Sequence, residues 1–177
     1  MNSFSKASAT KLLKESADAL LLALANDKHA GQSDWLVSVH QFPPQPAVME
    51  VMTLHVYRPG WFNDDRQGIH FETFIGEKEW KRKQIQIAMH IFHCEEIPGT
   101  KLKRRAVAVP FVDAIFPLVS TWEGYKFRAG KYGAHPFTKI LTFELDEFPQ
   151  KLSAELEKLC AQLGPVMDST LERVLSD

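Results

Sequence analysis

Residues 68–93 constrain the fold of this chain more than any other stretch, because they carry the alternating pattern of two consecutive strands. In the first half, the positions on the apolar side are Ile69, Phe71, Thr73 and Ile75. In the second half, they are Ile85, Ile87, Met89 and Ile91. A period of two is typical of a strand that buries one face, and the charged residues 77–79 after Gly76 indicate a solvated turn. We therefore predict a β-hairpin around which the rest of the chain is organised.

The remaining strands follow from the same alternation, bounded by turn residues. We predict them at residues 35–42, 48–58, 125–129 and 137–145. Apolar residues at helical spacing predict amphipathic helices over residues 8–26 and from Pro149 onward, with Gly164-Pro165 kinking or dividing the second. A shorter helix is expected to begin at Pro110, where the missing amide is harmless, and to end near Leu118.

This order of elements predicts the fold class. Short links between successive strands favour an antiparallel sheet, and helices outside the strand run indicate α+β rather than alternating α/β. We therefore predict that residues 1–177 form a single α+β domain. Its single antiparallel sheet has about six strands, with an N-terminal helix, a short helix after strand four and a long C-terminal helix packed on one face.

Net charge and cysteine content indicate which partners and which cellular compartment to expect. A net charge of −1 gives no global field that would attract a membrane or nucleic acid, so we expect no membrane partner and do not favour nucleic acid. The basic runs in residues 78–83 and 101–105 are interpreted as solvated. Cys94 and Cys160 match no metal or redox spacing, which favours reduced thiols in a cytoplasmic protein.

Strand parity gives the most specific prediction about a site. If the first four strands turn their aliphatic sets to the helices, each places one histidine on the opposite face. The residues predicted on that face, as a candidate binding surface, are His40, His55, Tyr57, His70, Glu72, Gln86 and His90, together with Thr53. His93 has the parity of the apolar set, so we expect it at the edge of the core.

This polar face has two interpretations. Antiparallel sheets often leave one face uncovered, in which case the histidines lie on a surface that holds a partner. Alternatively, neutral imidazoles and one carboxylate suit zinc or a similar divalent metal. The metal ligands in that case are His55, His70, Glu72 and His90. The strand register decides whether the four histidines lie close together or far apart, and the sequence does not reveal this register.

Two other features are candidates for a site. Trp61 and Phe62 lie in a loop and either anchor a partner or fold back onto the sheet edge. Asp64 or Asp65, followed by Glu79-Trp80-Lys81, resembles the arrangement in restriction-type nucleases. That resemblance implies acids that hold magnesium and a lysine that aids the attacking water. In the family the Glu-x-Lys pair lies within a strand, whereas here it lies in the predicted turn.

No Gly-rich phosphate loop, Gly-x-Ser-x-Gly elbow or Cys-x-x-Cys pair occurs in the sequence. The leading hypothesis is therefore a soluble binding or adaptor module without a cofactor. It would be a homodimer that uses the exposed sheet face or its terminal helices to hold a protein or small-molecule partner. The element order is similar to that of small α+β secretion chaperones. The alternative is an enzyme, a metal-dependent hydrolase such as a nuclease, with the His/Glu site on the sheet face.

Overall fold

The computed structural model describes residues 3–26, 34–42, 51–63, 66–92, 96–97 and 100–176. Within these ranges, one antiparallel sheet has the strand order β1-β2-β3-β4-β6-β5. The strands are β1 (Leu36–Gln41), β2 (Met52–Tyr57), β3 (Ile69–Ile75), β4 (Gln84–Ile91), β5 (Tyr125–Phe127) and β6 (Phe137–Thr142). The alternating patterns correctly predicted all six, with shorter bounds in most of them.

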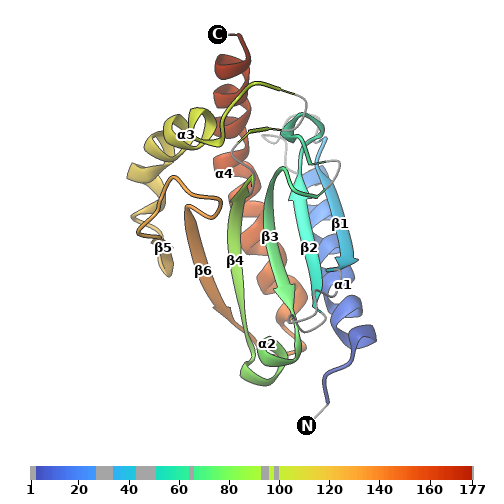
Figure 1. Ribbon diagram of the computed structural model, residues 1–177. Helices are drawn as coiled ribbons and strands as arrows, with labels where there is room; N and C mark the ends of the chain where they lie inside the picture. Colours follow the sequence, from blue (N-terminus) through green and yellow to red (C-terminus); the bar gives the residue numbers. More distant parts are fainter. Residues whose placement is uncertain are drawn as a thin grey trace.

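Helices accompany the sheet at both ends of the chain and after β4, which confirms the predicted α+β class. They are α1 (Lys6–Asn26), the 3-10 turn η1 (Pro59–Trp61), α2 (Glu77–Arg82), α3 (Arg104–Val119) and α4 (Phe148–Ser176). Figure 1 shows α1 and α4 behind the sheet, so the opposite face is turned toward the viewer. No helix in the described ranges combines the length and apolarity needed to cross a membrane.

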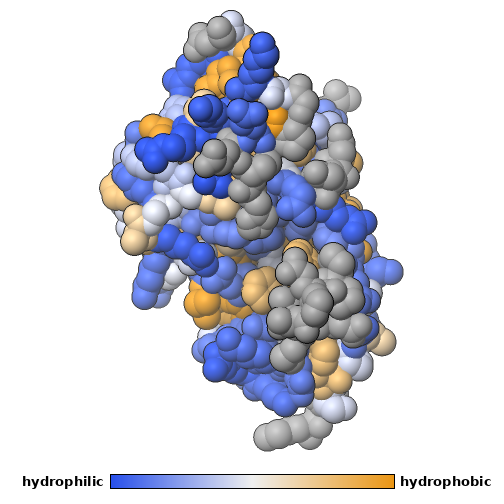
Figure 2. Space-filling model, in the orientation of Figure 1, coloured by the Kyte–Doolittle hydropathy of each residue, from blue (hydrophilic) through white to orange (hydrophobic). Residues whose placement is uncertain are grey.

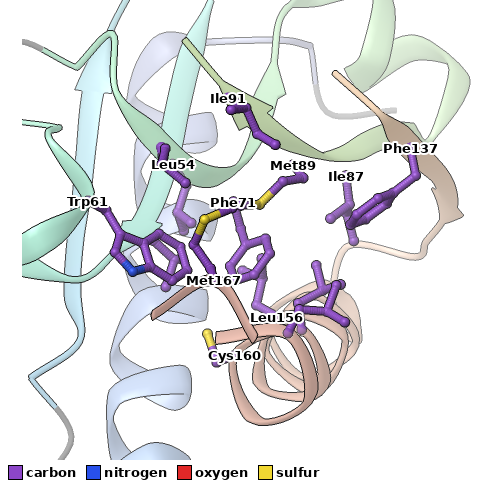
Figure 3. Packing of buried hydrophobic residues seen from close by; sticks show 14 of the residues in the cluster. Leu54, Trp61, Phe71, Ile87, Met89, Ile91, Phe137, Leu156, Cys160 and Met167 are labelled. Atoms are coloured by element: carbon purple, nitrogen blue, oxygen red, sulfur yellow. The ribbon is translucent and has the colours of Figure 1, made fainter. Parts of the chain in front are cut away.

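The core lies between the sheet and the two long helices. Figure 3 shows Phe71 and Met89 of the sheet pointing toward Leu156 and Met167 of α4, and all four are fully buried. Burying a side chain of this size contributes about 1.5–3 kcal/mol relative to leaving it exposed. The apolar parity set of the central hairpin therefore faces the helices, as the alternation predicts.

Gly164-Pro165 was predicted to kink or divide the last helix, and it does not divide it, because α4 runs unbroken from Phe148 to Ser176. Pro165 lacks an amide and costs one backbone hydrogen bond. Gly164 has a packing role instead: a Cβ at this position would lie 2.7 Å from Cζ2 of Trp35. The helix therefore keeps glycine where the indole presses against its backbone.

Two other local predictions need correction. The charged stretch after Gly76 is the helix α2 rather than a solvated turn, and its Trp80 is buried. The third helix begins at Arg104 instead of Pro110 and contains Pro110 and Pro117 in its interior. Its buried stripe of Val107, Phe111, Ile115 and Val119 has helical spacing, and this packing outweighs the cost of the prolines.

Candidate functional site

The strand register places the predicted histidines on the sheet face opposite α1 and α4. His40 pairs with Thr53, and Ser38 pairs with His55. His55 in turn pairs with Glu72, and His70 pairs directly with His90. Paired residues of antiparallel strands project from the same face. Each of the first four strands therefore contributes one imidazole to a single surface, the face turned toward the viewer in Figure 1.

These imidazoles form a continuous line across the sheet, which we call the histidine row: His40, His55, His70, His90 and His135. Consecutive ring centroids are separated by 4.5, 3.7, 4.5 and 5.1 Å in that order. The sequence did not identify the fifth member. His135 precedes Pro136 in the connection between β5 and β6, where no alternation assigns a side chain to a face. The side-chain contacts of a loop residue of this kind come only from the tertiary structure.

Glu72 is approached by three imidazoles of the row. Its Oε1 lies 2.9 Å from Nε2 of His135. Its Oε2 lies 3.4 Å from Nε2 of His70 and 3.8 Å from Nε2 of His55. The ligand atoms of His55, His70 and Glu72 all lie within 4.8 Å of one another. We call these three residues the His/Glu triad. It contains three of the four residues predicted as metal ligands.

Asn63 fixes the tautomer of His70. The Oδ1 atom of Asn63 accepts a hydrogen bond from the Gly68 amide at 3.1 Å and lies 2.8 Å from Nδ1 of His70. An amide oxygen only accepts hydrogen bonds, so Nδ1 carries the proton. Burial lowers the pKa of His70, which favours the neutral ring. In that form Nε2 holds a lone pair and faces the Glu72 carboxylate.

His90 is held in the same way, because its Nδ1 lies 2.7 Å from the Gly68 carbonyl oxygen. A carbonyl oxygen accepts the Nδ1 proton, so in the neutral ring Nε2 again holds the lone pair. Hydrogen bonding through one ring nitrogen, with the other left as an acceptor, is the arrangement found around metal-bound histidines.

The other groups of the site have charge states set by burial. Burial lowers the pKa of His55 to about 2, helped by His70 and His40. Burial together with Arg66 lowers the pKa of His40 to about 4. Burial raises the pKa of Glu72, but the hydrogen bond with the imidazole of His135 outweighs this and holds the pKa of Glu72 well below its usual range. At neutral pH the triad therefore combines neutral imidazoles with a carboxylate.

The centre of this face is not the exposed surface that the sequence predicted. His55, His70 and His90 are only 3%, 1% and 2% exposed, partly because stacked rings cover one another. Toward β6 the site opens, since the side chains of Glu72 and His135 are 18% and 22% exposed. The open end of the site is therefore its Glu72–His135 edge.

The remaining predicted face residues lie outside the triad. Tyr57 is half-buried at the end of β2 and pairs with Leu36. Gln86 is half-buried on β4, and its Oε1 accepts a hydrogen bond from Arg128 at 3.3 Å. Both share the polar face by parity, but neither belongs to the converging set.

Of the two interpretations of the loop with Trp61 and Phe62, the packing of Trp61 supports the one in which the loop folds back. This residue is 1% exposed, lies edge-on to Trp35 at a centroid distance of 5.3 Å, and donates from Nε1 to Asp168 at 2.8 Å. Phe62 is half-buried against Phe92. The loop therefore folds back onto the core, where the large apolar indole of Trp61 is buried.

The nuclease-like set is only partly within the described residues, because Asp64 and Asp65 lie outside them. His93 and Cys94, for which the sequence also made predictions, lie outside them too. Glu79 accepts a hydrogen bond from the Gly76 amide and caps α2, and Lys81 forms an ion pair with Glu77 at 2.5 Å. The Glu-x-Lys pair thus lies in a short helix rather than in a strand, and both of its charged residues have local structural partners.

No known protein-family model, curated protein or solved structure matches this chain.

Proposed function

We propose that this protein binds one divalent transition-metal ion through the His/Glu triad and uses it as a metal-dependent hydrolase. The observation that supports this proposal is the convergence of the ligand atoms of His55, His70 and Glu72 within 4.8 Å. Two neutral imidazoles and one carboxylate match the donor set of many catalytic zinc sites.

The contact between His70 and Glu72 favours a cation bound between the two side chains. A neutral His70 that donates from Nδ1 has no proton on Nε2 to offer the carboxylate 3.4 Å away. A lone pair and a carboxylate oxygen repel each other unless a cation lies between them. A divalent ion satisfies both groups, and the neutral imidazoles bind it without first losing a proton.

The type of metal follows from the donor atoms. Imidazole nitrogen with a carboxylate oxygen suits zinc, and also iron, cobalt or manganese, better than calcium or magnesium. Three protein ligands leave a position for water in a tetrahedral site. A bound ion of this kind supplies Lewis acidity and lowers the pKa of its water to near neutrality.

Residues next to the triad have defined parts in this proposal. His135 donates to Oε1 of Glu72 and orients the carboxylate from the open edge. Asn63 orients His70 from the buried side. Hydrolysis needs access for water and substrate. We propose that both enter at the partly exposed edge formed by Glu72 and His135.

The test is zinc binding by chelator-treated protein, measured by titration against a competing chromophoric chelator. We expect one ion per chain for the wild type. His70→Gln and Glu72→Gln each remove a ligand and should weaken the affinity by two orders of magnitude or more. The matched control is His40→Gln, which removes another imidazole of the row outside the triad and should stay within about threefold of the wild type.

The His40→Gln control distinguishes loss of a metal ligand from general damage to the histidine row. Equal loss in all three variants would indicate damage to the row as a whole, and absence of zinc binding by the wild type would refute the proposal. Circular dichroism spectra of each variant without metal establish that the fold is intact.

Partner binding is the second candidate function, and the exposed apolar side chains of two adjacent elements support it. They are Leu21 and Leu22 of α1, Leu36 of β1 and Phe42 just after β1, each at least 37% exposed. β1 is also an edge strand of the sheet, and exposed apolar groups beside an open edge favour association. A second copy of the chain is the partner we propose.

Light scattering coupled to size exclusion tests this second proposal. We expect the wild type to elute with the mass of two chains and Leu22→Glu to shift toward one. Lys11→Glu, a charge change at an exposed position of the same helix, is the control. A wild-type mass of one chain at 100 μM, about the working range of a weak dimer, would contradict it.

A further inference from the structure

The histidine row is buried at its centre and more exposed at its His135 end, and exposed cations lie beyond that end. His70 at its centre is 1% exposed, whereas the side chains of Glu72 and His135 are 18% and 22% exposed. Beyond them, Lys126 of β5 and Arg128 just after it are both exposed. A ligand that approaches Glu72 from this side passes these two side chains.

The register places both cations on the face that carries the triad. Glu72 pairs with Ala88, Ala88 pairs with Thr138, and Thr138 pairs with Lys126. These four residues therefore form one line across the sheet, all projecting from the same side. Arg128 follows Lys126 by two residues and so has the same parity.

Arg128 reaches back across β6 toward the site. Its Nη2 donates to Oε1 of Gln86 on β4 at 3.3 Å, which places the guanidinium one strand away from the strand of Glu72. Strands lie about 5 Å apart and two residues span about 7 Å, so the backbone positions of Gln86 and Glu72 are roughly 8 Å apart. A small oxyanion bound at Glu72 would therefore lie near this guanidinium.

The charge of the face favours such a ligand. Among the described strand positions on this face, Glu72 is the sole carboxylate, whereas Lys126 is cationic, and Arg128 adds a second cation. A divalent ion at the triad would leave the surface more positive still. Figure 2 shows hydrophilic residues over much of the visible part of this face, with an apolar patch near its middle.

From these observations we infer that the metal site acts on a small oxyanionic substrate, a phosphate ester or a carboxylate, whose charged group lies between the triad and Arg128. This inference rests on the proposed metal site and adds its substrate class. Arginine is suited to the role because its planar guanidinium binds phosphate and carboxylate oxygens in pairs. Gln86 holds the guanidinium over the sheet, and Lys126 adds a second charge at the entrance.

The experiment uses full-length protein carrying one equivalent of zinc and freed of excess metal. Binding of inorganic phosphate is measured by calorimetry for the wild type, Arg128→Gln and Arg173→Gln. Arg173 lies in the last turn of α4, so its replacement makes the same change of charge away from the polar face. Acetate replaces phosphate in a parallel series, and the zinc content is measured for every sample.

We expect phosphate to bind the zinc-loaded wild type, to bind Arg128→Gln at least tenfold more weakly, and to bind Arg173→Gln within twofold of the wild type. Tighter binding of phosphate assigns a phosphate ester, and tighter binding of acetate assigns a carboxylate. If zinc is retained but neither anion binds, or Arg128→Gln binds like the wild type, this inference alone is overturned. If the wild type holds no zinc, the proposed function is overturned as well.

Discussion

At the scale of single residues, the site depends on groups that fix the orientation of its imidazoles. Asn63 is the clearest case, because one amide oxygen accepts from both the Gly68 amide and the ring of His70. The stacking of His55 on His70, with centroids 3.7 Å apart, restrains the same ring from its face. Contacts within the protein therefore hold the triad in position, which lowers the entropic cost of binding a ligand.

Asn63→Ala should weaken zinc binding by roughly 10- to 100-fold, the usual effect of losing a partner that orients a ligand. Asn63→Asp keeps an acceptor for both donors and should restore most of the affinity. The competition titration described above measures both variants. Equal affinities for Asn63→Ala and the wild type would show that Asn63 does not position His70.

The buried neutral state of His55 predicts a dependence of stability on pH in metal-free protein. Its pKa is about 2 in the folded chain, against the 6.5 of an ordinary histidine, so below pH 6.5 the unfolded chain binds a proton that the folded chain does not. Stability is therefore lost as the pH falls through 6.5, by at most about 1.4 kcal/mol per pH unit from this residue.

Urea unfolding at pH 7 and pH 5 in the presence of a chelator measures this effect. The wild type should lose more stability across that interval than His55→Phe, whose side chain is also an aromatic ring but cannot be protonated. Identical losses in the two proteins would mean that His55 is protonated in the folded state at pH 5, in conflict with its burial.

At the scale of elements, the sequence predicted what periodicity controls and missed what packing controls. Alternation identified the strands and put His40, His55, His70 and His90 on one face. It carried no information about His135, whose loop position is set by tertiary contacts. Propensity also misplaced the start of α3, because burial of its apolar stripe outweighs two internal prolines.

The contact between α4 and Trp35 is the element-level feature most sensitive to mutation. Gly164→Ala places a Cβ 2.7 Å from the indole, so either the ring or the helix must move. We expect a loss of about 1–3 kcal/mol, typical of overpacking. Gly130→Ala is the control, since a Cβ there meets nothing within 4 Å.

Chemical denaturation of the two glycine variants gives the comparison directly. Gly130→Ala should unfold within about 0.5 kcal/mol of the wild type, as surface substitutions usually do. A Gly164→Ala protein as stable as that control would show that α4 and Trp35 are not in close contact.

At the scale of the whole molecule, the sheet separates two environments. One face carries the apolar core with α1 and α4, and the other carries the histidine row with its single carboxylate at the described strand positions. This arrangement lets a buried polar site exist beside a complete core. The predicted residues share one face, but the centre of that face is buried, a property that register and ring stacking determine.

Cys160 reports on the integrity of the core side. Its side chain is 1% exposed and burial raises the pKa of its thiol well above the usual range, so it should resist iodoacetamide in native protein. Mass spectrometry of the peptide that contains Cys160 should show labelling only in denaturant. Rapid labelling at pH 8 without denaturant would contradict the packing of α4 against the sheet.

The most direct test of the metal site is X-ray absorption at the zinc edge on protein reconstituted with one equivalent of zinc. The proposal predicts a first shell of nitrogen and oxygen at about 2.0–2.1 Å with the outer-shell scattering of two imidazoles. This signature should disappear in His70→Gln and persist in His40→Gln. A shell of sulfur at about 2.3 Å, which requires cysteine ligands, or a shell without imidazole scattering would contradict the His/Glu triad as the metal site.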